Sequence, residues 1–116
     1  MGALKLTDLV EKLGLEVKTG AHRLDVEVTR GYASDLMSDV MANANEGDLW
    51  VTLQTHQNIV AVAAMKALAG IILVNSRKPE EETIQKAEAE GVPIMTSSLP
   101  TFELVGRLFE LGVSGS

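Results

Sequence analysis

The sequence contains no cysteine, which excludes disulfide bonds, thiol nucleophiles, iron–sulfur ligation and cysteine-based zinc sites within this chain. Cationic residues are also few, since ten Lys and Arg stand against sixteen Asp and Glu for a net charge of −6. This acidic balance is the opposite of the basic footprint of a nucleic-acid-binding protein. No apolar run approaches the roughly 18 residues of a membrane span, and the first residues lack a continuous signal-peptide core. We therefore expect a cytoplasmic protein with neither nucleic-acid nor membrane partners.

The residues that are present have the composition of one globular domain. Of the 116 residues, 46% are hydrophobic and 22% are charged. Such a chain can build one core and is too short for two ordinary domains. We expect a single domain over residues 1–116, with residues 113–116 at the Ser-Gly-Ser ending as a frayed tail.

The spacing of hydrophobic residues predicts an α/β fold. A first helix is expected over Leu6–Leu13, followed by two short strands, Leu15–Val17 and Leu24–Val28, around a glycine-containing turn. Helical spacing returns between Ala33 and Ala44. After this segment, strands are predicted at 49–53, 70–74 and 92–95, and helices at 58–68, 79–91 and 101–112. This alternation predicts a mainly parallel sheet of about five strands flanked by helices.

Polar residues follow the three later strands. In a parallel sheet, the carboxyl ends of the strands meet the amino ends of the following helices at one edge, where ligands usually bind. Arg77 and Lys78 add positive charge at this edge, and helix N-termini favour anions. The candidate binding residues are Thr52, Gln54, Thr55, His56, Gln57, Asn58, Asn75, Ser76, Arg77, Thr96 and Ser97.

These residues predict a site for a small anionic ligand, such as a nucleotide or a phosphorylated metabolite. In the alternative interpretation, the hydroxyl groups of Thr55, Ser98 and Thr101 only cap helices.

Signals for catalysis are weak. His56 could act as an acid or base, but the local sequence offers it no serine or carboxylate partner. Asp35 and Asp39 lie four residues apart in the predicted helix 33–44 and would share a face, as an acid/base or magnesium pair or as a solvated surface. The sequence has no GxxxxGK[ST] phosphate loop, no GxGxxG after a strand and no GxSxG elbow. We therefore expect no enzymatic activity, no metal site and no cofactor.

Two segments resemble a known family. The stretch GIILVNSRKPEEETIQKAEAEGVPIMTSSLPTFELVGRL, residues 70–108, resembles the second half of the DRTGG domain. The preceding YASDLMSDVMANANEGDLWVTLQTHQNIVAVA resembles the stand-alone, hydrogenase-associated branch of that family. The family's signature is not literally present. The chain has Thr55-His56-Gln57 where the signature places Asp-Arg-Thr, and Asn75-Ser76 where it places Gly-Gly.

The resemblance implies a regulatory role. DRTGG domains accompany CBS modules in some pyrophosphatases and are similar to the N-terminal domain of HPr kinase/phosphorylase. The resemblance therefore implies a non-catalytic sensor that binds a small anionic ligand, such as an adenine nucleotide, together with a protein partner. It also implies a homodimer and a context in hydrogenase or redox metabolism.

Two alternatives remain open at this stage. The chain could be a ligand-free homodimeric interaction module, with Trp50, Met37 or Met41 at the interface or, for Trp50 equally, in the core. It could also be a phosphotransferase-type enzyme that uses His56 with Asp35 or Ser97.

Overall fold

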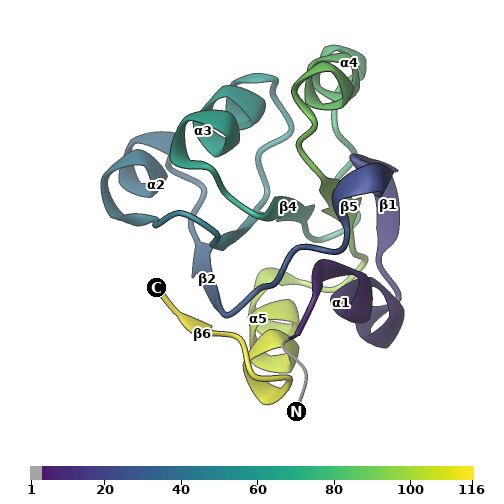
Figure 1. Ribbon diagram of the computed structural model, residues 1–116, viewed down its shortest axis with the longest axis vertical. Helices are drawn as coiled ribbons and strands as arrows, with labels where there is room; N and C mark the ends of the chain where they lie inside the picture. Colours follow the sequence, from purple (N-terminus) through teal and green to yellow (C-terminus); the bar gives the residue numbers. More distant parts are fainter. Residues whose placement is uncertain (1–3) are drawn as a thin grey trace.

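Strands and helices alternate along the computed structural model, which describes residues 4–116 (Figure 1). The strands are β1 (Glu16–Thr19), β2 (Arg30–Ala33), β3 (Leu49–Thr52), β4 (Gly70–Leu73), β5 (Ile94–Thr96) and β6 (Ser114–Gly115). The helices are α1 (Leu6–Leu13), α2 (Met37–Asn43), α3 (Asn58–Lys66), α4 (Glu81–Glu90) and α5 (Thr101–Glu110), with a short 3-10 helix at Ala21–Arg23. None of the helices in the described part of the chain has the length and hydrophobicity needed to cross a bilayer.

The strands form one sheet in the order β1-β5-β4-β3-β2-β6. The pairs from β2 to β5 are parallel, and only β1 runs antiparallel to its neighbour. The predicted α/β fold with a mainly parallel sheet is confirmed. The sheet has six strands among the described residues, where the sequence predicts about five.

The central strands bury both of their faces. Leu49 and Val51 of β3 contribute to one hydrophobic core, whereas Trp50 between them contributes to the other. Figure 1 shows α2, α3 and α4 on one side of the sheet and α1 and α5 on the other. The unbroken hydrophobic runs in the sequence follow from this double coverage, since successive strand residues point to opposite faces.

The predicted hairpin is wrong. Residues 24–28 form no strand and contribute only an isolated bridge between Lys5 and Glu27. β1 instead pairs with β5, and the Thr19 hydroxyl accepts a hydrogen bond from Ile94 N at 2.9 Å where the register shifts. Gly20 permits this contact, because a Cβ there would lie 2.6 Å from Pro93 Cα.

The helix predicted from Ala33 begins only at Met37. Its first predicted residue belongs to β2, and Asp35 lies in the connection before the helix. Asp35 and Asp39 therefore do not share a helix face, and the paired-acid interpretation is wrong. The physical reason is that Asp35 Oδ1 accepts hydrogen bonds from Leu53 N at 2.7 Å and Thr52 Oγ1 at 3.0 Å, which ties the chain to the end of β3.

Of the two interpretations of Trp50, the core one is confirmed and the interface one is wrong. Trp50 is fully buried and donates from Nε1 to Ser34 O at 2.8 Å. Met37 and Met41 pack against the same core. The expected frayed tail at 113–116 instead contains β6, which pairs in parallel with β2. β2 offers a free edge of backbone groups that the last residues satisfy.

Candidate functional site

The four parallel strands β2 to β5 end at the same edge of the sheet. The loops that follow them are residues 34–36, 53–57, 74–80 and 97–100. Ligands of open α/β sheets bind outside these carboxyl ends. This edge therefore contains the candidate site, and its polar loops are the ones that the sequence singles out.

A cavity of about 310 Å³ opens at this edge between the loop after β4, the loop after β5 and the start of β1. It is lined by Gly14, Glu16, Lys18, Ser76, Arg77, Lys78, Thr96, Ser97 and Ser98. Four of these residues carry hydroxyl groups, and three carry a positive charge. The one carboxylate of the lining forms an ion pair with one of these cations, since Glu16 Oε2 lies 3.1 Å from Lys18 Nζ. The cavity is a cationic, hydroxyl-rich site in a protein whose net charge is −6.

The loop after β4 is held in an unusual backbone conformation. Asn75 has φ 60° and Ser76 has φ 58°, both in the left-handed region that glycine occupies most readily. Asn75 N donates to Leu99 O at 2.8 Å, and Ser76 N donates to Ser97 O at 2.9 Å. These two bonds join the loop to the segment after β5 and bring Arg77 to the same cavity as Ser97.

The structure thus brings together four of the eleven predicted residues, Ser76, Arg77, Thr96 and Ser97, in one cavity. Asn75 supports this cavity through its backbone and does not line it. Lys78 and Ser98, which the sequence places on the same loops, also line the cavity.

Sequence reasoning missed Lys18 and Glu16. Both belong to β1, which joins the site because it runs antiparallel to β5 with Glu16 opposite Thr96. The alternation in residues 15–19 predicts the strand, but no local signal indicates that its partner lies about eighty positions further along the chain.

The loop after β3 forms a separate cluster. Thr52, Gln54, Thr55, His56, Gln57 and Asn58 are not among the residues that line the cavity. Gln54 Nε2 donates to Asp35 O at 2.9 Å, and Thr55 O accepts from Thr83 Oγ1 at 2.7 Å. These polar groups connect the β3 loop to its neighbours on both sides.

The geometry gives His56 no catalytic partner within this cluster. Its Nδ1 accepts a hydrogen bond from Asn58 N at 3.1 Å, and the residue is exposed. Asp35 binds the end of β3, and Ser97 Oγ accepts from Leu99 N at 3.1 Å. Among residues 4–116, no three His, Asp or Glu side chains gather as a metal-binding group.

The alternative in which Thr55, Ser98 and Thr101 cap helices is wrong. The N-cap positions of α3 and α5 are Gln57 and Pro100, and neither makes a side-chain cap hydrogen bond. Thr55, Ser98 and Thr101 therefore do not cap these helices. Ser98 lines the cavity instead.

Comparison with known families identifies the domain. The DRTGG domain family model matches residues 8–111. The chain belongs to the DRTGG domain family. None of the curated proteins compared with it matches the chain.

A solved structure of a DRTGG-containing protein shares the fold. It is the crystal structure of the CBS and DRTGG domains of the regulatory region of Clostridium perfringens pyrophosphatase, complexed with its activator, diadenosine tetraphosphate. The TM-score is 0.72 at 16% identity, over 93% of this chain and 46% of the other. The present chain therefore spans less than half of that regulatory region.

The loop after β4 differs in sequence from the signature of the family. Asn75 and Ser76 stand at the positions to which the resemblance assigns the Gly-Gly of the signature, and both have positive φ. Glycine pairs suit such a turn because they lack a Cβ. At these two positions the chain therefore carries side chains in a backbone conformation that glycine adopts most readily.

Proposed function

We propose that this DRTGG domain is a non-catalytic regulatory module that binds a small anionic ligand, in particular an adenine nucleotide, in the 310 Å³ cavity. The observation that carries the proposal is the gathering of Lys18, Arg77 and Lys78 around hydroxyl groups in an acidic protein. Guanidinium and ammonium groups form strong charge-assisted hydrogen bonds with phosphate oxygens, and hydroxyl groups orient the same oxygens.

The related regulatory region supports the choice of ligand class. That protein is complexed with diadenosine tetraphosphate, an adenine nucleotide with several negative charges. A phosphate chain of this kind would match the positive charge of Arg77 and Lys78, and that of Lys18, which also pairs with Glu16. The hydroxyl groups of Ser76, Thr96, Ser97 and Ser98 would then bind the oxygens that the cations leave free.

Occupancy of the cavity would be transmitted through the loops that line it. The segment 97–100 leads directly into α5, and its backbone is bonded to the loop that leads into α4. A ligand that contacts Arg77 and Ser97 together would bias the relative position of these two loops. A homodimer partner, or a partner protein in hydrogenase or redox metabolism, remains our prediction for the receiver of this change. A cytoplasmic location likewise remains a prediction.

The test is isothermal titration calorimetry with AMP, ADP, ATP and diadenosine tetraphosphate. Replacement Arg77→Ala should weaken binding by about 1.5 to 3 kcal/mol, which is roughly a ten- to hundredfold rise in Kd, if its contact is charge-assisted. Lys86→Ala is the matched control, because this exposed cation on α4 does not line the cavity. An unchanged Kd in Arg77→Ala would show that the nucleotide does not bind in this cavity.

The two alternatives are outcomes of the same experiment. Nucleotide turnover in the titrated samples would favour a phosphotransferase, and its loss in His56→Ala would identify the base. His56 Nδ1, Asp35 Oδ1 and Ser97 Oγ already accept hydrogen bonds from backbone N–H groups, which favours ligand binding over catalysis. Absence of binding across the panel would favour the ligand-free interaction module.

A further inference from the structure

A groove of about 470 Å³ opens at the edge of the sheet that lies opposite the candidate site. Its lining includes Gly47, Ala69 and Pro93, which come just before strands β3, β4 and β5. The groove therefore lies at the amino ends of these parallel strands, and we refer to it as the amino-edge groove. It shares no lining residue with the 310 Å³ cavity, so its role is independent of the proposed function.

Much of the lining of the amino-edge groove is apolar. Val92 is buried, and Val26 and Leu68 are half-buried. Ala64 and Ala67 line the groove at the end of α3 and are exposed, so their small side chains leave the apolar surface accessible to a partner. This surface favours a ligand with an aliphatic part.

Three glutamates also line the groove. Glu27 precedes β2, Glu46 lies in the loop before β3, and Glu90 is the last residue of α4. All three are exposed, and none of them forms an ion pair within residues 4–116. Arg23 is the one cation in the described lining. The groove therefore offers carboxylates to a cationic ligand.

The helix ends add negative potential to the groove. Both α3 and α4 end there, and Ala67 and Gly91 follow their last turns with positive φ. The last carbonyl groups of a helix lack intrahelical donors and carry the negative end of its dipole. Arg23 lies at one of these ends, because its Nη1 is 3.2 Å from the position that a Cβ of Gly91 would occupy. A guanidinium group therefore packs against the end of α4.

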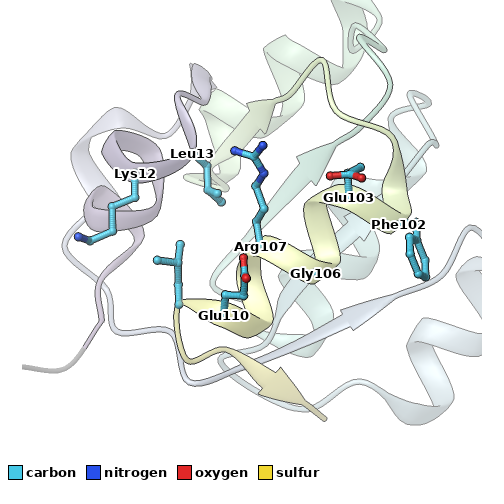
Figure 2. Close-up of a pocket in the computed structure, with 8 residues that line it drawn as sticks. Lys12, Leu13, Phe102, Glu103, Gly106, Arg107 and Glu110 are labelled. Carbon is cyan, nitrogen blue, oxygen red and sulfur yellow. The ribbon is translucent and has the colours of Figure 1, made fainter.

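The depression between α1 and α5 lacks such a uniform charge. It has a volume of about 620 Å³, and two cations and two carboxylates line it, namely Lys12, Arg107, Glu103 and Glu110. Figure 2 shows Arg107 directed toward α1 at Leu13. Cations and carboxylates are mixed in this depression, whereas the amino-edge groove has three carboxylates to one cation. The charge of the amino-edge groove therefore selects one kind of partner.

We propose that the amino-edge groove is the docking site for a basic segment of a partner protein. An arginine or lysine of that segment lies with its aliphatic stem on Val26 and Leu68, and its charged head lies among Glu27, Glu46 and Glu90. Both side chains combine an apolar stem with a cationic head. Guanidinium and ammonium groups donate to carboxylates and to the free carbonyl groups at helix ends.

Other occupants fit these groups less well. A wholly apolar segment would remove the three carboxylates from water without supplying donors. An acidic segment would place like charges together. A metal ion requires gathered ligands, and among the described residues no three His, Asp or Glu side chains form such a group. Charge complementarity therefore favours the basic segment.

NMR titration of the full chain tests the groove. The probe is a short synthetic peptide of alternating leucine and arginine, and the control peptide has citrulline in place of arginine. Citrulline keeps the shape of arginine and lacks its charge. The arginine peptide should shift the amide resonances of Ala64, Leu68 and Gly91 in a saturable manner, and the citrulline peptide should bind at least about tenfold more weakly.

A charge variant tests the carboxylates of the groove. Combining Glu27→Gln, Glu46→Gln and Glu90→Gln should raise the Kd of the arginine peptide about tenfold or more, because this variant loses the charged acceptors for the peptide's cations. Ala64→Trp fills the groove without changing its charge and should weaken the peptide as strongly. These side chains are exposed, so circular dichroism should show folded variants.

The matched control combines Glu80→Gln, Glu81→Gln and Glu82→Gln. It removes the same amount of charge from exposed residues at the other end of α4. The Kd of the arginine peptide should change less than about threefold in this control, since solvent and salt screen charges that lie away from the groove.

Absence of binding, resonance shifts confined to other surfaces, or equal binding of the citrulline peptide would overturn the proposal. An equal rise of the Kd in the two glutamine variants would do the same, because it would reduce the effect to net charge. Spermidine distinguishes a protein segment from a small cation. If spermidine binds the groove as tightly as the arginine peptide does, the occupant is a free polyamine and the docking of a protein segment is refuted.

Discussion

Ser76 illustrates how one residue combines backbone strain with a place in the cavity. Its φ of 58° belongs to the region where a Cβ crowds the backbone, and Ser76 N is nevertheless held by Ser97 O at 2.9 Å. The hydrogen bonds of the loop hold this residue in a conformation that costs a side-chain-bearing residue about 1 to 2 kcal/mol. The strained loop is the one that presents Arg77 to the cavity.

Replacement Ser76→Gly should therefore stabilise the protein. We expect a gain of about 1 kcal/mol in the free energy of unfolding, measured by urea denaturation, because glycine avoids the Cβ clash at positive φ. Ser76→Ala is the control and should give no gain, since alanine keeps the Cβ. A loss of stability in the glycine variant would contradict this expectation. It would show that the Ser76 hydroxyl group stabilises the fold by more than the relief of backbone strain does.

At the scale of elements, β2 and α2 are joined by a polar network. The Tyr32 hydroxyl donates to the Asp39 carboxylate, lying 2.9 Å from both oxygens, and Asn43 Nδ2 donates to Asp39 Oδ1 at 2.8 Å. Hydrogen bonds from Ser34, Tyr32 and Asn43 hold the pKa of Asp39 below its usual value of 3.8. The bond to Asp39 raises the pKa of Tyr32 above 10.0.

The lowered pKa of Asp39 predicts a pH-dependent contribution to stability. The ionised carboxylate is favoured in the folded state, so its contribution is present above the unfolded pKa of about 4 and disappears as pH falls through the folded value. Asp39→Asn should lower the free energy of unfolding at pH 7, and the difference from wild type should shrink toward pH 2. Urea titrations across this range measure it.

Asp25→Asn is the control for this titration, since Asp25 is exposed and lies outside the network. The raised pKa of Tyr32 works in the opposite direction. Its contribution is complete below pH 10 and disappears as pH rises through the folded value. A difference between Asp39→Asn and wild type that stays constant from pH 7 to pH 2 would contradict the role of the ionised carboxylate.

At the scale of the whole molecule, the cavity joins segments that are distant in sequence. β1, the loop after β4 and the loop after β5 meet there only in the folded chain. A ligand of this cavity binds the native state and not the unfolded chain. Its binding free energy is therefore added to the stability of the whole domain.

A nucleotide at about one hundred times its Kd should stabilise the protein by about 2.7 kcal/mol, which corresponds to roughly 10 °C in Tm for a domain of this size. The same nucleotide concentration should shift Arg77→Ala about half as far if its Kd is about tenfold weaker. Differential scanning calorimetry measures both shifts. Equal shifts in the two proteins would place the nucleotide outside this cavity.

Much of the architecture could be predicted because its signals are local. The alternation of hydrophobic strands and amphipathic helices after residue 49 identifies β3, β4 and β5, and glycines mark the ends of α1 and α4. The prediction that the polar loops meet at one edge of the sheet follows from the parallel arrangement of the strands alone. The same reasoning placed Arg77 and Ser97 in neighbouring loops, and the structure brings them to one cavity.

The sequence by itself determined that this chain is an α/β domain with polar loops at the carboxyl ends of its strands, because hydrophobic periodicity and helix termination depend on near neighbours. Only the tertiary structure decided that β1 pairs with β5, that Asp35 bends the chain before α2, and that β6 completes the sheet. These contacts join residues far apart in sequence, and they depend on which backbone edges and polar atoms remain unsatisfied. Lys18 reaches the cavity, and Phe102 and Phe109 remain at the surface, through the same non-local packing.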